Sequence, residues 1–181
     1  MKQKLSCLNL GCGKDIKIST ELREWINLDA LKLPGVEVVH DLEKPLPFED
    51  NYFEEVFASH VLEHINNFMG LMEELYRVCK NGAIIKIICP YFASVSAFQD
   101  PTHIRFFTLK NFDYFLPDNY NNFITKARFK IIKKKIKLTR KNWIINIPIE
   151  FIINYMQWIY ERFFCFILPF QEVEYELEVL K

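Results

Sequence analysis

An apolar run that breaks into a Gly-x-Gly turn constrains this chain more than any other feature. Residues 5–10 are mostly apolar and lead directly into Gly11, Cys12 and Gly13. Such a run predicts a buried parallel strand, and a glycine turn at its end lets a nucleotide-like ligand approach the backbone. A dinucleotide fingerprint needs a third glycine three residues after the second, where this chain has Ile16. The pattern therefore favours a nucleotide-like ligand and disfavours a nicotinamide oxidoreductase.

An acidic residue closes the next strand-like run. Residues 25–28 are followed by Asp29, and a carboxylate at that place can accept hydrogen bonds from both hydroxyls of a ribose. Asp29 also fits a turn residue, which is the alternative. The order of strand, glycine turn, strand and terminal Asp predicts a nucleoside site at one edge of a sheet.

Strand-like and helix-like segments alternate through the first half of the chain. We expect strands over 5–10, 25–29, 36–39, 55–58 and 83–89, and a helix over 66–80. The helix follows from apolar residues at helical spacing, and Gly82 is expected to cap its C-terminus. The strand over 83–89 is nearly all apolar, as expected for a strand that is buried on both faces. The alternation predicts a parallel sheet with helices on both faces.

Two later segments alternate between apolar and charged residues. In the segment 128–138, one face is predicted to carry Ile132, Ile136 and Leu138, and the other Lys133, Lys135 and Lys137. In the segment 172–179, four glutamates alternate with apolar residues that are expected to face inward: Val173, Tyr175, Leu177 and Val179. If the two strands are neighbours, the lysine and glutamate faces partly neutralise each other.

An apolar insertion separates these two strands, over about residues 142–170. Its polar residues fall at i, i+4, i+7 and i+11, and they are Glu150, Asn154, Gln157 and Glu161. This spacing predicts a helix with one narrow polar stripe facing water and a buried apolar face that includes Phe151, Ile152, Tyr155, Trp158 and Ile159. A transmembrane span would carry charged residues in its apolar stretch, so we reject it. Three interpretations remain: the helix lids the site, forms a dimer face, or lies on a membrane with Lys133–Lys141 against anionic lipid.

The resemblance to a known family becomes specific over residues 40–64. The signatures Leu-Gly-Cys-Gly, Leu-Pro-Phe and Val-Leu-Glu-His stand at residues 10–13, 46–48 and 61–64, and the first is preceded by Leu8 and Asn9. In this order they resemble the class I S-adenosylmethionine-dependent methyltransferases of the broad type 11 group, over roughly residues 5–115. The resemblance implies an α/β, Rossmann-like doubly wound sheet. Its seven strands have the order 3-2-1-4-5-7-6, with strand 7 antiparallel and the helical insertion between strands 6 and 7. It also implies one methyltransferase domain over 1–181, with S-adenosyl-L-methionine as cofactor.

The chain departs from the family pattern near its start. Only Asp15–Glu24 separates the glycine turn from the second strand, so the first crossover helix must be short or partly irregular. We expect the cover of the cofactor to come from the loop over 91–107 or from the insertion.

The resemblance and the chemistry together assign a donor pocket. Gly11 and Gly13 are expected to approach the methionine part, Asp29 the ribose, and Asp41 the adenine amino group. Ser59 and His60 are expected to border the methionine carboxylate and the methyl group. The full set of expected cofactor-binding residues is Asn9, Gly11, Cys12, Gly13, Asp29, Asp41, Leu42, Ser59 and His60.

The acceptor side is predicted from the polar and aromatic loop that follows the strand over 83–89. Such a loop at the carboxyl edge of a parallel sheet is where ligands bind. We predict His103 as general base, because imidazole titrates near neutral pH, with His64 as the second candidate. Tyr91, Asp100 and Arg105 are the predicted acceptor contacts, and the alternative for His103 and Arg105 is a network that pins the loop. A metal site from Asp100, His103 and His64 has no supporting ligand spacing, so no metal is expected.

The composition limits the classes of binding partner that the sequence predicts. The 23 basic and 23 acidic residues cancel, which gives no global attraction to nucleic acid. The five cysteines form no Cys-x-x-Cys pair and fit buried free thiols in a reducing compartment. We find no signal peptide and expect a cytoplasmic protein. The predicted function is direct methyl transfer from S-adenosylmethionine to a small-molecule acceptor, such as a sugar or glycan precursor. The alternative is a catalytically inactive, methyltransferase-like binding subunit.

Overall fold

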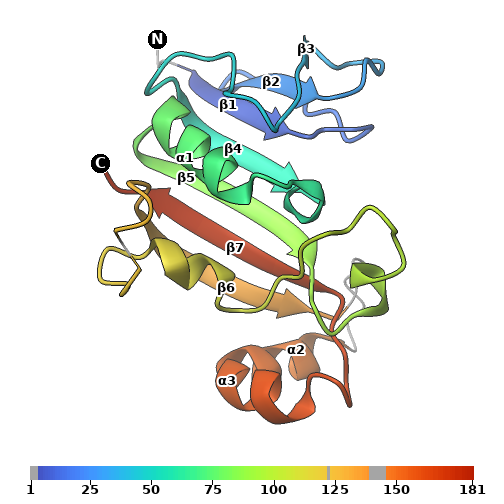
Figure 1. Ribbon diagram of the computed structural model, residues 1–181. Coiled ribbons are helices and arrows are strands. Elements are labelled where there is room, and N and C mark those ends of the chain that lie inside the picture. Colours follow the sequence, from blue (N-terminus) through green and yellow to red (C-terminus); the bar gives the residue numbers. More distant parts are fainter. Residues whose placement is uncertain (1–3, 122, 139–145) are drawn as a thin grey trace.

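The computed structural model describes residues 4–121, 123–138 and 146–181. One seven-stranded sheet runs through the molecule in the order β3-β2-β1-β4-β5-β7-β6 (Figure 1). The strands are β1 Leu5–Leu10, β2 Arg23–Asp29, β3 Val38–Val39, β4 Phe53–Ser59, β5 Cys79–Pro90, β6 Phe129–Lys137 and β7 Glu172–Val179. The strands β1 to β5 pair in parallel, and β7 is antiparallel to both β5 and β6. The predicted strand order and the antiparallel seventh strand are therefore confirmed.

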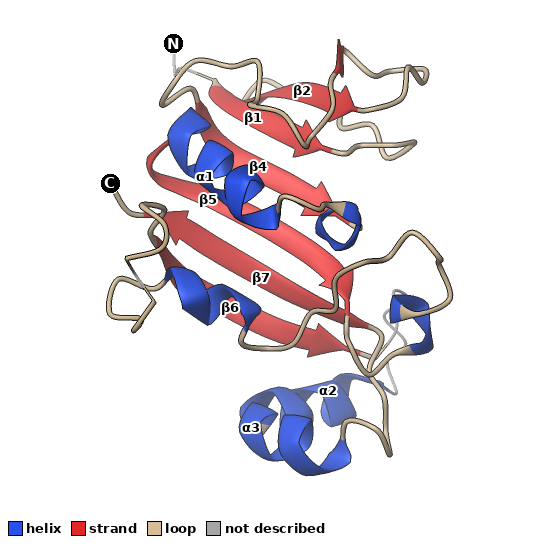
Figure 2. Ribbon diagram, in the orientation of Figure 1, coloured by secondary structure: helices blue, strands red, loops and turns tan. Residues whose placement is uncertain are grey.

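The sheet has fewer helices than a doubly wound fold usually carries. Residues 11–22, all of which the structure describes, contain no helix, whereas the sequence predicts a short or partly irregular one. The helix α1, Phe68–Val78, lies on one face of the sheet (Figure 2). The short 3-10 helices are η1 Leu62–His64, η2 Val95–Ala97 and η3 Asn111–Phe115. Among the described residues no helix covers the opposite face, so the expectation of helices on both faces is wrong there, and the crossover over residues 11–22 is irregular.

The open face of the sheet carries charged and half-buried side chains instead. Glu55 on β4 accepts from Arg23 at 2.8 Å and from Lys86 on β5 at 2.9 Å. Ile84 and Ile88 on this face of β5 are only half-buried. The expectation that β5 is buried on both faces is therefore also wrong. The core lies on the covered face, where Ile85 and Ile87 pack with the apolar side of α1.

The end of α1 differs from its prediction. The helix stops at Val78, and Cys79 already has extended backbone and begins β5. The pairing between β4 and β5 shifts from Phe53↔Cys79 to Glu55↔Ile84, so the residues between Cys79 and Ile84 form an irregularity in the strand. Gly82 adopts a φ of 78° there. Its left-handed backbone serves this bulge and not a helix cap.

The lysine and glutamate faces of the last two strands meet as expected. Lys133 contacts Glu176 at 3.2 Å, Lys130 contacts Glu178 at 3.6 Å, and Lys137 pairs with Glu174. Val173, Tyr175, Leu177 and Val179 are all buried, as predicted.

Two residues of this hairpin depart from the prediction. The register shifts between Ile131 and Lys133, which turns Ile132 outward, where it is 49% exposed. Glu172 is buried, at 6% exposure, because it begins β7 next to the predicted site.

The insertion folds as helices but with its two faces reversed. It contains α2 Asn146–Tyr155, α3 Gln157–Ile159 and the π-helical turn η4 Tyr160–Phe164, and Figure 1 shows it beyond the edge of β6. The polar stripe turns toward the protein, with Glu150 only 9% exposed. The predicted apolar contacts are instead exposed, with Phe151 at 74%, Tyr155 at 86% and Trp158 at 62%. The predicted orientation of both faces is wrong.

Hydrogen bonding to an edge strand explains the reversal. Glu150 Oε1 accepts from Leu138 N at 3.0 Å, and Asn154 bonds both the N–H and the C=O of Ile136 at 2.9 Å. Gln157 Nε2 donates to Lys134 O at 2.9 Å. Steps of three to four residues along a helix rise about 4.5–6 Å, near the roughly 6.6 Å between alternate residues of a strand. The polar stripe therefore forms hydrogen bonds with the outward-facing backbone N–H and C=O groups of β6. It covers a strand edge that would otherwise stay open.

Within the described residues, no helix is both long enough and apolar enough to cross a membrane. The segment 139–145, which includes part of the predicted Lys133–Lys141 cluster, lies outside the described residues.

Candidate functional site

Two cavities meet at the carboxyl ends of the central strands. The first, which we call the glycine-turn cavity, has a volume of about 610 Å³ and is lined by residues 11–15, Phe57, Ser59, His60, Ile88, Lys137, Glu172 and Glu174. The second, the histidine cavity, measures about 390 Å³ and is lined by His60, His64, Pro90, Ser96, Gln99, Asp100, His103, Gln171 and Glu172. His60 and Glu172 line both cavities. Ligands of open α/β sheets bind at this edge.

The two glycines of the turn have different roles. Gly11 adopts a φ of 60°, and a Cβ placed there would lie 2.4 Å from Val61 Cγ2. Gly11 therefore lets the turn pack against the protein. Gly13 adopts a φ of 51°, and a Cβ there would meet nothing within 4 Å. The backbone at Gly13 consequently borders open space that a ligand can fill.

Asp29 lies at the end of β2 and contacts the glycine turn directly. Its Oδ2 accepts from Gly13 N at 2.7 Å and its Oδ1 accepts from Leu31 N at 2.9 Å. Each carboxylate oxygen keeps further acceptor capacity, so the same side chain can still receive ribose hydroxyls. The carboxylate is therefore both a brace for the turn and a candidate ligand contact.

Three other predicted donor residues lie away from the glycine-turn cavity. Asn9 is buried and donates to Asp15 O and Asn27 Oδ1, so it ties the first two strands together. Leu42 belongs to the core. Asp41 is exposed, and the backbone N–H of Glu43, followed by Lys44, holds its pKa below the usual value. Cys12, Gly13, Ser59 and His60 do line the cavity, and their contact with the cofactor stays a prediction.

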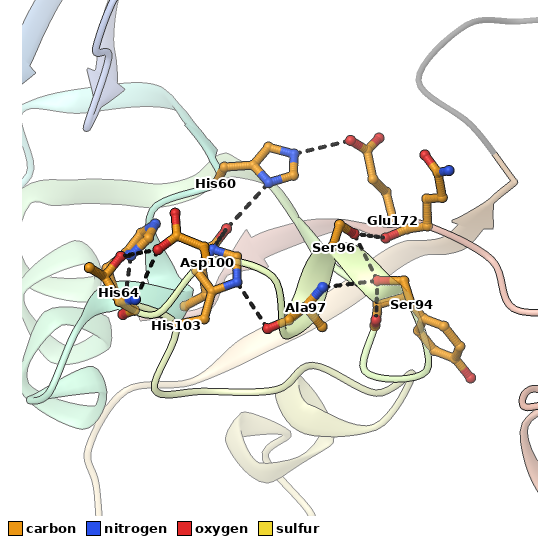
Figure 3. A network of polar contacts seen from close by, with 12 residues as sticks. His60, His64, Ser94, Ser96, Ala97, Asp100, His103 and Glu172 are labelled. Carbon is orange, nitrogen blue, oxygen red and sulfur yellow. Dashed lines mark hydrogen bonds and ion pairs between the residues drawn. The ribbon is translucent and has the colours of Figure 1, made fainter.

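His60 has an unusual backbone and two carboxylate neighbours. Its φ of 57° is rare for a residue other than glycine, and such strain concentrates at functional sites. Nε2 lies 3.1 Å from Glu172 Oε1 and Nδ1 lies 3.3 Å from Glu63 Oε1 (Figure 3). The ring is thus fixed at the junction of the two cavities, between carboxylates from η1 and β7.

The other two histidines lie side by side on the wall of the histidine cavity (Figure 3). Their ring centres are 4.7 Å apart. His103 Nδ1 donates to Ala97 O at 3.0 Å, because a carbonyl can only accept. His64 Nδ1 contacts Thr102 Oγ1 at 2.9 Å, and that hydroxyl donates to Asp100 Oδ1 at 2.6 Å. The hydrogen bonds that the hydroxyl and the backbone N–H of Thr102 donate to Asp100 also lower the pKa of that carboxyl group.

Two predicted acceptor contacts serve the fold. Tyr91 is fully buried and its hydroxyl donates to Glu161 of the insertion at 3.2 Å, so the structure places it outside the histidine cavity. Arg105 Nε donates to Ile65 O at 2.7 Å, and its Nη2 donates to Asn66 O. These bonds pin the loop after η1, as the structural alternative predicts.

The sequence analysis missed two buried carboxylates of the site. Glu63 was hidden within the Val-Leu-Glu-His signature, and Glu172 within the alternating glutamates of β7. The signal for Glu172 was its place as the first residue of that strand, at the edge where ligands bind.

The cysteines are all free and buried, as predicted. Burial raises the pKa of Cys7 to about 11 and that of Cys79 to about 12. Burial, and then the negative charge of Glu63, raises the pKa of Cys89 well above its ordinary value. Because the thiolate is the reactive form, these thiols are chemically quiet.

Comparison with known proteins finds a family model that matches part of the chain. Residues 15–87 match the model of a methyltransferase domain. The chain is 39% identical over 62 residues to the demethylmenaquinone methyltransferase of Bacillus cereus, a match that covers 34% of this chain and 25% of that protein. The chain thus matches about a quarter of the length of these curated relatives.

Solved structures share the whole fold at low identity. The YcgJ protein from Bacillus subtilis superposes with a TM-score of 0.64 at 16% identity, covering 98% of this chain and 92% of that one. A SAM-dependent methyltransferase from Archaeoglobus fulgidus gives a TM-score of 0.57 at 18% identity, covering 97% and 86%. These likenesses show the fold.

Proposed function

We propose that this chain is a class I S-adenosylmethionine-dependent methyltransferase that transfers a methyl group to a small hydroxylated acceptor. The observation that carries the proposal is the junction of the two cavities at His60 and Glu172. A donor in one cavity and an acceptor in the other would meet there. Methyl transfer from a sulfonium needs such alignment above all, because the leaving group is already activated.

The glycine-turn cavity is the proposed donor site. The methionine part would lie along Gly13 and Ser59, where the backbone borders open space. Asp29 would receive the ribose hydroxyls while it keeps its bond to Gly13 N. Asp41, at the far edge after β3, remains a predicted contact of the adenine amino group.

The histidine cavity is the proposed acceptor site. Its volume of about 390 Å³ suits a small molecule. Ser96, Gln99, Asp100 and Gln171 give its wall hydrogen-bonding groups. A polar wall of this kind favours a hydroxylated acceptor, such as a sugar or glycan precursor, over a long apolar one.

We assign the proton of the acceptor to the pair formed by His60 and Glu172. The pair borders both cavities, whereas His103 turns its Nε2 toward Glu63, at 3.9 Å from Oε1. In the reaction the acceptor oxygen bonds the methyl carbon, the carbon–sulfur bond breaks, and sulfur keeps the electron pair. The proton leaving the acceptor passes to the His60–Glu172 pair. The earlier hypothesis that His103 or His64 is the base stays a prediction, and the same assay tests it.

Calorimetry with S-adenosylmethionine tests the donor site. Asp29→Ala should weaken binding by on the order of 1–3 kcal/mol, the cost of unpaired hydrogen-bonding groups. Asp29→Asn is a graded control, since its amide oxygen can still accept from Gly13 N while its NH2 group can no longer accept from Leu31 N. Unchanged affinity in a folded Asp29→Ala variant would refute the ribose assignment.

Turnover tests the acceptor site and the proton-accepting pair. It is measured as the S-adenosylhomocysteine released from S-adenosylmethionine in the presence of a panel of hydroxylated acceptors. His60→Ala should lower turnover by roughly 10²–10⁴-fold, a larger loss than any weakening of donor binding that follows because His60 also lines the donor cavity. An equal loss in His103→Ala alone would support the earlier hypothesis instead. If neither S-adenosylmethionine nor S-adenosylhomocysteine stabilises the chain in a thermal shift, it is the inactive binding subunit.

A further inference from the structure

A carboxylate and two imidazoles gather beside the histidine cavity in an arrangement that the proton-transfer proposal does not use. Glu63, His64 and His103 each offer one ligand atom, and these atoms all lie within 4.8 Å of one another. Glu63 and His64 come from η1, whereas His103 comes from the loop after β5. No spacing in the sequence could reveal the set, because the two segments are brought together only by the fold.

Glu63 is the most unusual member of the cluster. Its side chain is fully buried, and among the described residues its carboxylate oxygens have no hydrogen-bond donor other than the weak thiol donor of Cys89. Buried carboxylates are normally paired, hydrogen-bonded or bound to a metal ion. His60 Nδ1, at 3.3 Å from Oε1, is the competing partner, although its geometry makes no hydrogen bond.

The two histidines are held in the tautomer that metal binding needs. His103 donates its Nδ1–H to Ala97 O, so in the neutral ring the lone pair is on Nε2, the atom that faces Glu63. The Thr102 hydroxyl gives its own proton to Asp100, and therefore accepts the Nδ1–H of His64. Metal-binding histidines typically donate their second N–H in this way to a carbonyl or a carboxylate-linked group.

We propose that Glu63, His64 and His103 bind one divalent transition-metal ion of the zinc class. Two imidazoles and a carboxylate form a ligand set of catalytic zinc sites, with one position left for water or substrate. Ligand atoms around such an ion lie roughly 3.3–3.5 Å apart. His103 Nε2 and Glu63 Oε1, at 3.9 Å, therefore need only a small closure. The free position faces the cavity that His64 and His103 line.

The role of the ion, unlike its binding, rests on the proposed function. An ion at this wall would bind a hydroxyl of the acceptor and lower the pKa of that hydroxyl. The proton would still leave through the His60–Glu172 pair, and the oxygen would attack the methyl carbon as described above. The site would then select acceptors with an oxygen that can reach the ion.

Metal titration of the full chain tests the site without donor or acceptor. After removal of metals by chelation, Zn²⁺ should bind with a stoichiometry of one by calorimetry, and Co²⁺ should give visible absorption that Zn²⁺ abolishes. Glu63→Gln, His64→Ala and His103→Ala should each weaken Zn²⁺ binding by at least about 100-fold, since even the loss of a supporting residue costs 10–100-fold. Thr102→Val, which removes the hydroxyl that supports His64 and donates to Asp100 but keeps every proposed ligand, should cost about 10-fold.

The controls separate this site from a structural cluster. His40→Ala removes the histidine that follows β3 and should leave Zn²⁺ affinity unchanged. Metal-free Glu63→Gln should be at least as stable to urea as the native chain, because a buried charge is removed. If Glu63 instead serves only to hold His60, this variant will lose stability and keep its Zn²⁺ affinity. That result, or native protein that binds no Zn²⁺, overturns the proposal, whereas loss of S-adenosylmethionine binding would overturn only the proposed function.

Discussion

The side-chain amide of Asn154 takes the place of a neighbouring strand along the open edge of β6. Its Oδ1 accepts from Ile136 N and its Nδ2 donates to Ile136 O, both at 2.9 Å. We expect Asn154→Ala to lower the free energy of unfolding by about 1–3 kcal/mol. The figure is two hydrogen bonds at roughly 0.5–1.5 kcal/mol each, toward the lower end if water reaches the freed groups.

Urea denaturation followed by circular dichroism measures this loss. The neighbouring Tyr155→Ala is the matched control, because Tyr155 is 86% exposed and should change the free energy by less than about 0.5 kcal/mol. Amide hydrogen exchange adds a local measurement, since Ile136 N–H should be protected in the native chain and exchange faster in Asn154→Ala. A loss below about 0.5 kcal/mol with unchanged exchange at Ile136 would refute the edge-pairing argument.

Three further predictions use the same denaturation assay. Replacing both Phe151 and Trp158 with serine should change stability by no more than about 0.5 kcal/mol, since both are exposed; a larger loss, or an altered sedimentation coefficient, would mean that this face is covered. Hydrogen bonding from Arg77 lowers the pKa of Glu74 below its usual 4.5. The ionised carboxylate therefore stabilises the fold above about pH 4.5, and this contribution should be lost as the pH falls further. The fall in the free energy of unfolding should be smaller in Glu74→Gln. A fall of equal size in Glu74→Gln would remove this explanation. Gly11→Ala should cost more than about 1 kcal/mol, since its Cβ meets Val61 and its φ is positive, and a neutral change would contradict the close packing.

The strands could be predicted because side chains along a strand alternate between the two faces of the sheet, so buried residues recur at every second position. The last strand shows this best, since Val173, Tyr175, Leu177 and Val179 are buried as the alternation required. Bulges escape such patterns. Ile132 and Gly82 each look regular in sequence, yet one lies at a register shift and the other inside an irregular strand.

The insertion could be predicted as a helix but not oriented. Its spacing shows that two faces differ, and the usual preference for buried apolar area then assigns the polar stripe to water. That assignment ignores the unpaired N–H and C=O groups of an edge strand, which need partners. Glu150, Asn154 and Gln157 supply them, and the pattern of the helix alone contains no information about that edge.

The residues of the site lie partly inside and partly outside the matched methyltransferase domain. Residues 15–87, which match the methyltransferase domain, contain Asp29, His60 and Glu63, whereas His103 comes from a loop beyond them. The structure joins the two parts tightly, because the N–H groups of Ile104 and Arg105 both donate to Glu63 O. A change in the acceptor loop therefore acts directly on the backbone that carries Glu63. Acceptor choice and the chemistry at the donor methyl should consequently change together in variants of this loop, even where donor affinity does not.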